Sequence, residues 1–143
     1  MNEMFCFQCQ QTAHNKGCDG KVGVCGKKAD TANLQDELIG ALIAMSKAAE
    51  NGSPAEKTDE LMLKGLFTTI TNVNFNDVTI KQMTTAVREE KGRINSNRFE
   101  DHDMKELWKE HEDIRSLKSL ILFGIKGMAA YAYHALALGK KDD

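Results

Sequence analysis

Apolar residues recur at helical spacing over most of the chain beyond residue 30. Positions three and four residues apart lie on one face of an α-helix, so this pattern predicts amphipathic helices that share a core. Short polar segments separate these helices, and helices joined by short turns pack most simply as antiparallel bundles. The pattern therefore predicts an all-α fold, with helices over residues 31–50, from residue 53 to the threonines at 68 and 69, and over 77–92, 104–110 and 112–138.

Several of the expected helix ends carry local signals. Ser53-Pro54-Ala55-Glu56 combines a capping box with proline at the first helical position. Thr31 or Asp30 is expected to cap the first helix, because either side chain can accept from an unpaired backbone N–H. The remaining signals are a cap at Asn76 or Asp77 for the third helix, a stop at Gly92, and a stop at Gly139 for the last helix.

The last helix is apolar on more of its surface than a small bundle can bury. A helix that is apolar on several faces belongs in a larger core. We therefore expect the remainder of a longer parent chain, or a protein partner, to cover the helix at 112–138. Its apolar stripe consists of Ile114, Leu117, Leu120, Ile121, Ile125, Met128 and Leu136.

All four cysteines lie near the N-terminus, at Cys6, Cys9, Cys18 and Cys25. The spacing C-x2-C-x8-C-x6-C places the first pair on a tight turn, where both sulfurs can face one metal centre. Glycines around the later pair allow backbone N–H groups to turn inward and donate to the sulfurs of an anionic cluster. The motif predicts a metal site held by four thiolates, and the spacing fits an iron–sulfur cluster and structural zinc equally well. Positive charge is added around it by Lys16, Lys21, Lys27 and Lys28.

Two other interpretations of the cysteines compete with a four-thiolate site. Disulfides would suit a secreted domain, but the N-terminus lacks the apolar segment of a signal peptide, which favours metal chemistry. His14 lies between Cys9 and Cys18 and could replace one thiolate, although four thiolates already complete the site.

The charge balance and the absence of other motifs narrow the function classes. With 19 basic and 21 acidic residues the net charge is -2, so no basic surface for nucleic acid is expected. No apolar run reaches the roughly 18 residues that a bilayer span needs. Neither a glycine-rich phosphate loop nor a serine nucleophile motif occurs. We expect a cytoplasmic protein that binds neither nucleic acid nor membrane.

Two sequence blocks resemble one known family. MFCFQCQQTAHNKGC, followed by VGVCGKKADTANLQDELIGAL, resembles the N-terminus of the hybrid cluster protein family, also called prismane proteins or hydroxylamine reductases. DIRSLKSLILFGIKGMAAYAYHAL, at residues 113–136, resembles a later helix of the same family. The resemblance covers the whole chain and implies the N-terminal domain of a larger enzyme.

The resemblance implies that Cys6, Cys9, Cys18 and Cys25 hold a cubane [4Fe-4S] cluster. The last gap is one residue longer than that group usually has, which leaves a [2Fe-2S] cluster or zinc as alternatives. Family members form homodimers, take electrons from a redox donor protein, and reduce hydroxylamine to ammonia or nitric oxide to nitrous oxide at a hybrid iron–sulfur–oxygen cluster. The ligands of that hybrid cluster have no counterpart here, so the chain alone is expected to be inactive.

The chain is expected to divide into a cysteine-rich cluster-binding loop at 1–30, a three-helix bundle at 31–100 and the start of a second helical bundle at 101–143. Two hypotheses about function follow. The first is an iron–sulfur electron-transfer module of an oxidoreductase. The second is a structural zinc-binding or metal-free helical module that mediates assembly.

Overall fold

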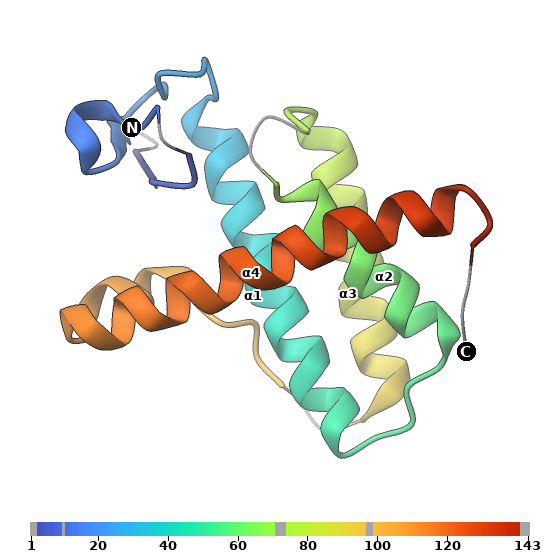
Figure 1. Ribbon diagram of the computed structural model, residues 1–143. Helices are drawn as coiled ribbons and strands as arrows, with labels where there is room; N and C mark the ends of the chain where they lie inside the picture. Colours follow the sequence, from blue (N-terminus) through green and yellow to red (C-terminus); the bar gives the residue numbers. More distant parts are fainter. Residues whose placement is uncertain (1–2, 10, 71–73, 97–98, 141–143) are drawn as a thin grey trace.

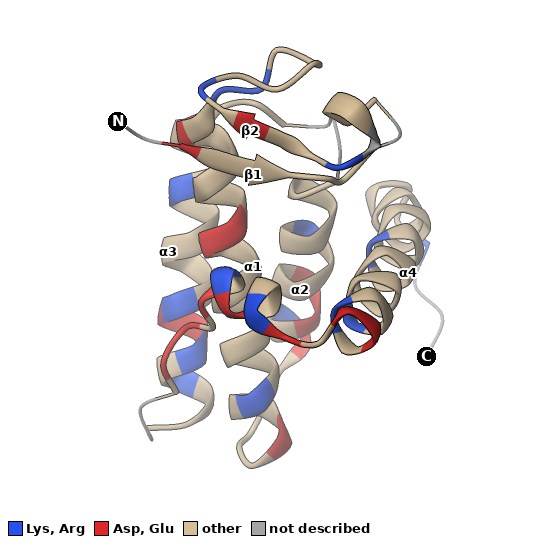
Figure 2. Ribbon diagram, turned by 90° about the vertical axis from the view of Figure 1, so that its left-hand side faces the viewer, with Lys and Arg blue, Asp and Glu red and all other residues tan. Residues whose placement is uncertain are grey.

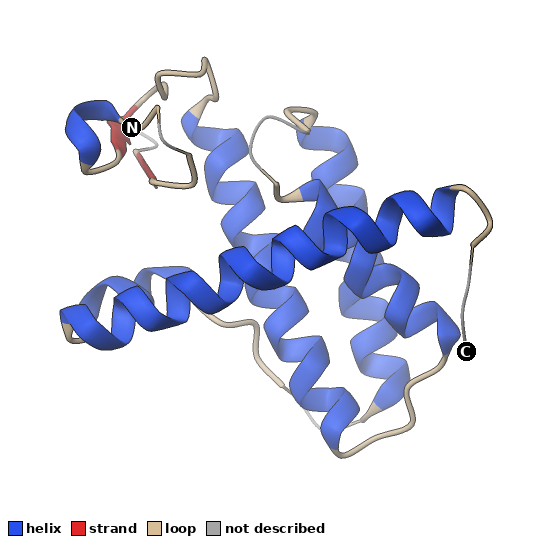
Figure 3. Ribbon diagram, viewed as in Figure 1, coloured by secondary structure: helices blue, strands red, loops and turns tan. Residues whose placement is uncertain are grey.

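The computed structural model describes residues 3–9, 11–70, 74–96 and 99–140. Most of the described chain is helical, which confirms the mainly α-helical prediction (Figures 1 and 3). In chain order the elements are β1 (Met4–Cys6), the 3₁₀ helix η1 (Ala13–Asn15), β2 (Cys18–Gly20), α1 (Ala29–Glu50), α2 (Glu56–Thr68), α3 (Asp77–Ile94), the 3₁₀ helix η2 (Met104–Lys109) and α4 (Glu112–Ala137).

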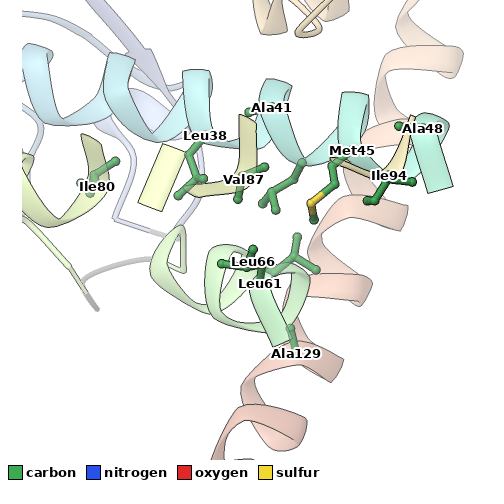
Figure 4. Close-up of a cluster of buried hydrophobic side chains, with 11 residues drawn as sticks. Leu38, Ala41, Met45, Ala48, Leu61, Leu66, Ile80, Val87, Ile94 and Ala129 are labelled. Atoms are coloured by element: carbon green, nitrogen blue, oxygen red, sulfur yellow. The ribbon is translucent and has the colours of Figure 1, made fainter. Parts of the chain in front are cut away.

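The main core lies between α1, α2 and α3. α1 packs along α3, and α2 contacts both. Gly65 allows α2 to approach α1 closely, since a Cβ atom at this position would lie 2.8 Å from Cδ2 of Leu42. The buried side chains of this core are Leu38, Ala41, Leu42, Met45, Ala48, Leu61, Leu66, Ile80, Val87, Ile94 and, from α4, Ala129 (Figure 4).

α1 begins two residues earlier than the sequence predicts. Ala29 and Ala32 are buried against the N-terminal segment, so the first turn of α1 gains apolar contacts that the periodicity after residue 30 does not reveal. Thr31 lies inside the helix, and its hydroxyl donates to Oδ1 of Asp77 at 2.7 Å. The predicted cap at residue 30 or 31 is therefore wrong, and Thr31 instead ties α1 to the start of α3.

α2 begins at Glu56 with Ala55 as its N-cap, so the predicted start at Ser53-Pro54 is wrong. The backbone N–H of Ala55 donates to Oγ1 of Thr58 at 3.0 Å. In a capping box, the side chain three residues after the N-cap accepts from the backbone N–H of the N-cap residue. Here Thr58 takes that role, although it lies outside the S-x-x-E pattern at residues 53–56.

α3 starts as predicted but ends later. The side chain of Asn76 accepts from the backbone N–H groups of Val78 and Thr79, at 3.0 and 3.2 Å, which confirms the cap. The helix continues through Gly92 to Ile94, and Ile94 is only 5% exposed within the main core. Burial of this side chain extends the helix past the glycine, so the predicted stop is wrong.

Glu90 is a buried carboxylate on α3 that faces α2. Its Oε1 accepts from Nη2 of Arg93 at 2.6 Å and from the hydroxyl of Thr58 at 2.7 Å. Nζ of Lys57 lies 3.7 Å from the other carboxylate oxygen. The hydrogen bond from Arg93, above all, holds the pKa of Glu90 at about 2, against the opposing effect of burial. Glu90 is thus ionised at neutral pH and joins the two helices.

α4 lies across the bundle and packs mainly on α2 (Figure 1). The ring of Phe67 stacks on that of Tyr133, with centroids 4.1 Å apart. Gly139 follows α4 with a φ of 67°, the left-handed conformation of a helix stop, as predicted. The side chains of α4 that are buried in this chain are Ser119, Lys126 and Ala129.

The apolar stripe of α4 is largely exposed in this chain. Leu120 is 68% exposed and Met128 73%, and Ile114, Leu117, Ile121 and Ile125 are exposed as well, whereas Leu136 is half-buried. Tyr131, outside the predicted stripe, is 84% exposed. By length and composition alone α4 would also suffice to cross a membrane, but the core helix of a soluble protein passes the same test. Contiguous exposed apolar surface of this kind marks an interaction site.

The N-terminal segment contains a small antiparallel sheet, where the sequence predicts only irregular loop. β1 pairs with β2, so that Met4 lies opposite Gly20 and Cys6 lies opposite Cys18. Met4 and Cys18 are buried with the first alanines of α1, which gives the hairpin a small core of its own. The sheet sits at one end of the helices, above the start of α1 (Figure 2).

Candidate metal centre

The four cysteines are carried by this hairpin and by the turns that follow its strands. Cys6 ends β1 and Cys18 begins β2, and residues directly opposite each other in an antiparallel pair place their side chains on the same face. Cys9 lies in the turn after β1, where its carbonyl accepts from the N–H of Thr12 at 3.2 Å. Cys18 is buried, and the other three cysteines are half-buried.

A glycine turn at residues 23–26 carries Cys25 and covers Cys18. The N–H of Gly26 donates to the carbonyl of Gly23 at 2.9 Å, and Gly26 has a φ of 83°, which favours glycine. The N–H of Val24 donates to Sγ of Cys18 at 3.4 Å. A Cβ atom on Gly23 would lie 3.6 Å from the same sulfur. The turn therefore brings backbone close to Cys18 and directs one N–H at its sulfur.

The four sulfurs do not converge on one point. All four cysteines are free thiols, so the structure contains no disulfide between them. Among the described residues, no three His, Cys, Asp or Glu side chains lie close enough together to hold one metal ion. His14 is exposed in η1 with a φ of 54°. The structure thus places Cys6 beside Cys18 and the Cys25 turn against them, but it does not form a closed tetrahedral site.

Lys27 follows the glycine turn and is buried, with 1% of its surface exposed. Its Nζ donates to Oε1 of Gln35 at 2.7 Å and lies 3.9 Å from Sγ of Cys6. Gln35, also buried, donates through Nε2 to the carbonyl of Asn74 at 2.9 Å. The Lys27 ammonium is therefore held next to Cys6 by a side chain that is itself fixed.

Lys126 of α4 is a second buried lysine in the same region. Its Nζ donates to Oε1 of Gln8, between the first two cysteines, at 3.0 Å and to the carbonyl of Thr69 at 3.3 Å. Burial lowers the pKa of Lys126 to about 8, although the nearby Asp36 carboxylate acts to raise it. Burial also raises the pKa of Asp36 to about 6, and Lys126 opposes that rise most strongly.

Aromatic rings shield one side of the first cysteine. Phe5 of β1 and Phe7, just after β1, pack edge-on against Trp108 of η2, with centroids 4.4 and 4.6 Å away. Phe7 also lies 5.6 Å from the ring of Phe123 on α4. These rings and Cys6 line a small cavity of about 20 Å³, which is room for about one water molecule. Segments distant in the sequence therefore cover one side of Cys6, which is half-buried.

The surroundings of the cysteines fit an anionic, thiolate-bound group. Within the described part of the chain, neither Lys27 nor Lys126 has a carboxylate at ion-pair distance. A buried ammonium group is costly unless an opposite charge compensates it. Four thiolates around zinc or an iron–sulfur cluster carry net negative charge, so either group would supply that compensation next to Cys6.

Part of this site is not evident from local sequence patterns. The sequence places Lys27 with Lys16, Lys21 and Lys28, but of these four only Lys27 is buried. Lys126 is missed because it lies far along the chain, and its one signal is a lysine inside the otherwise apolar middle of α4. Trp108 and Asp36 carry no sequence signal for a site, because only the fold brings η2 and α1 to the hairpin.

The chain is similar to known proteins over almost its whole length. The model of the Prismane/CO dehydrogenase family matches residues 4–143. The hydroxylamine reductase of Caldanaerobacter subterraneus subsp. tengcongensis is 45% identical over 99% of this chain and 31% of its own length. That of Thermoanaerobacter pseudethanolicus is 45% identical over 98% of the chain, and that of Desulfovibrio desulfuricans is 41% identical over 99%, again with 31% of each relative covered.

The chain spans about a third of the length of these relatives and aligns with their N-terminal part. The alignment with the Caldanaerobacter enzyme extends over 172 residues, whereas the chain has 143, so part of that stretch has no counterpart here. Because the family model matches almost the whole chain, the chain belongs to the Prismane/CO dehydrogenase family.

Proposed function

We propose that the chain is the N-terminal iron–sulfur electron-transfer domain of a hydroxylamine reductase, with Cys6, Cys9, Cys18 and Cys25 as ligands of a [4Fe-4S] cluster. The observation that carries this proposal is a set of four free cysteines on one hairpin and the turn that follows it, with a buried ammonium group next to the Cys6 sulfur and a backbone N–H directed at the Cys18 sulfur. The whole protein would reduce hydroxylamine to ammonia, or nitric oxide to nitrous oxide, at a hybrid cluster outside this chain.

Different residues of the chain would bind the cluster, stabilise its charge and exclude water at such a site. A bound cluster supplies one-electron transfer. The thiolates hold it, and the N–H of Val24 stabilises charge on the Cys18 sulfur. Phe5, Phe7 and Trp108 keep water from one side of Cys6. A separate redox protein would donate the electrons, and free cysteines of this kind suit a reducing cytoplasm.

The test is the metal content of the chain after anaerobic purification. We expect about four irons and about four sulfides per chain, with a broad brown absorption. About two irons would indicate a [2Fe-2S] cluster, so that the assigned cluster type would be wrong. One zinc per chain, with no uptake of iron and sulfide on reconstitution, would overturn the electron-transfer proposal. Hydroxylamine turnover by the 143-residue chain alone is not expected, since the hybrid-cluster ligands lie elsewhere.

A structural zinc-binding or metal-free assembly module is the second candidate. The sulfurs do not converge in the structure, which is compatible with a site that forms only around its metal. The exposed apolar face of α4 provides the surface that an assembly module needs.

We also propose a partner for that face of α4. The relatives are about three times as long as this chain, so they contain the polypeptide that an N-terminal domain would pack against. We assign the stripe around Leu120 and Met128 to contact with this remaining part of a hydroxylamine reductase, whether it belongs to the same chain or to another.

Mixing the chain with the remaining part of the Caldanaerobacter enzyme tests this partner. Sedimentation velocity should detect a complex with the native chain and with the control Gln82→Glu, which changes an exposed position on α3. The double change Leu120→Glu and Met128→Glu should abolish the complex, because charged groups on the stripe cannot be desolvated against an apolar surface. A native chain that forms only a symmetric dimer through α4, or that stays free, would contradict the proposal.

A further inference from the structure

We infer that Lys27 and Lys126 are positioning residues that supply buried positive charge beside the cluster and raise its reduction potential. The inference rests on the proposed function, because it requires a thiolate-bound cluster at the four cysteines. It assigns a role to two side chains that are not ligands and that the ligand motif does not include.

Both ammonium groups are fixed in place by neutral acceptors. Lys27 donates to the side-chain oxygen of Gln35, and Lys126 donates to the side-chain oxygen of Gln8 and to the carbonyl of Thr69. Neutral oxygens satisfy the N–H donors but do not cancel the charge. Both side chains are less than 5% exposed, so water cannot screen that charge as it does at the surface.

Among the described residues, Asp36 is the carboxylate that acts on Lys126, and one carboxylate cannot balance two lysines. Asp36 is half-buried and influences Lys126, but it forms no ion pair within 4 Å with either lysine. Even a fully ionised Asp36 leaves one of the two positive charges uncompensated. The sulfur of Cys6, 3.9 Å from Nζ of Lys27, lies where a compensating negative charge is expected.

The charge arrangement favours the reduced state of a bound cluster. Reduction adds one electron and therefore one negative charge, which a fixed positive charge a few ångströms away stabilises. The rings of Phe5, Phe7 and Trp108 lower the local polarity on one side, so the attraction is stronger than between exposed groups. Removal of either lysine charge should make the cluster harder to reduce.

The test compares midpoint potentials of the reconstituted 143-residue chain and three variants. Lys27→Gln and Lys126→Gln remove a buried charge but keep a hydrogen-bond donor, and Lys28→Gln removes an exposed charge next to Lys27. We expect a more negative midpoint potential for both buried variants and a value near the native one for Lys28→Gln, at equal iron and sulfide content. Buried variants whose potentials match that of Lys28→Gln would overturn the inference.

Unfolding of the cluster-free chains gives a second readout. Without the cluster the buried charges have no compensation, so Lys27→Gln and Lys126→Gln should unfold at the same temperature as the native chain or at a higher one. Earlier unfolding of these cluster-free variants, together with a lower iron content of the same variants after reconstitution, would assign the lysines to the fold and overturn the inference. A native chain that binds no iron would overturn the inference together with the proposed function, whereas normal iron uptake with unchanged potentials would overturn the inference alone.

Discussion

Replacement of Cys18 by alanine is expected to abolish stable cluster binding, with iron falling below about one atom per chain. Cys18 is the buried cysteine of the four, it lies opposite Cys6 in the sheet, and it accepts the N–H of Val24. The change removes both a ligand and the sulfur around which the glycine turn folds. Three thiolates cannot complete a cubane cluster that needs four protein ligands. Cys9→Ala should have the same effect for the same reason.

The helices should survive this loss. The main core consists of side chains from α1, α2, α3 and α4, and none of them comes from the cysteine hairpin. Far-UV circular dichroism of Cys18→Ala should therefore keep its helical signal while the iron content collapses. Val22→Ala is the matched control, because Val22 is exposed on the same segment and should retain full iron. A full complement of iron in Cys18→Ala or Cys9→Ala would refute the four-thiolate assignment.

Local patterns predict the helices well and their ends less well. The existence of α1, α3 and α4 follows from apolar spacing, and the Asn76 cap follows from side-chain chemistry within three residues. The predicted helix ends are wrong where a contact with a residue outside the local pattern stabilises a different end. Ile94 extends α3 past Gly92 because it fills the core, and Thr58 replaces the cap signal at Ser53. Tertiary burial outweighs local propensity at each of these ends.

The candidate site shows the same division between local and distant information. The cysteine spacing identifies the segment, because ligands of one metal are recognisable within a short stretch. The pairing of Cys6 with Cys18 is not predictable from that spacing, since a strand register depends on which side chains are buried. Lys126 is separated from Gln8 by almost the whole chain, so only the packing of α4 reveals their contact.

Gly40→Ala is expected to have the second largest effect, although Gly40 lies in the middle of α1. A Cβ atom at Gly40 would lie only 2.2 Å from the backbone oxygen of His102, and the N–H of His102 donates to the Gly40 carbonyl at 3.1 Å. Backbone cannot move aside as a flexible side chain can. We expect the free energy of unfolding to fall by about 2 kcal/mol, as overpacked positions typically lose. Chemical denaturation of the cluster-free chain measures this change.

Gly92→Ala is the matched control for that measurement. Gly92 also lies within a helix, but a Cβ atom there would meet nothing within 4 Å. Since alanine is the better helix former, this variant should be more stable than the native chain by up to about 1 kcal/mol. Equal stability of the two variants would show that the backbones of Gly40 and His102 are not in close contact in solution.

The effect of Gly40→Ala should also be detectable near Cys6. The segment that contacts Gly40 leads directly into η2, whose Trp108 packs on Phe5 and Phe7 beside Cys6. A methyl group that displaces His102 must move η2 or strain it, so Trp108 should become more exposed. Trp108 is the one tryptophan in the sequence, and its fluorescence should therefore shift to longer wavelength in Gly40→Ala and stay unchanged in Gly92→Ala. Because the rings keep water from one side of Cys6, the cluster should be lost faster in air in Gly40→Ala than in the native chain. If the fluorescence shifts but the rate of cluster loss stays the same, the rings of Phe5, Phe7 and Trp108 do not protect the cluster.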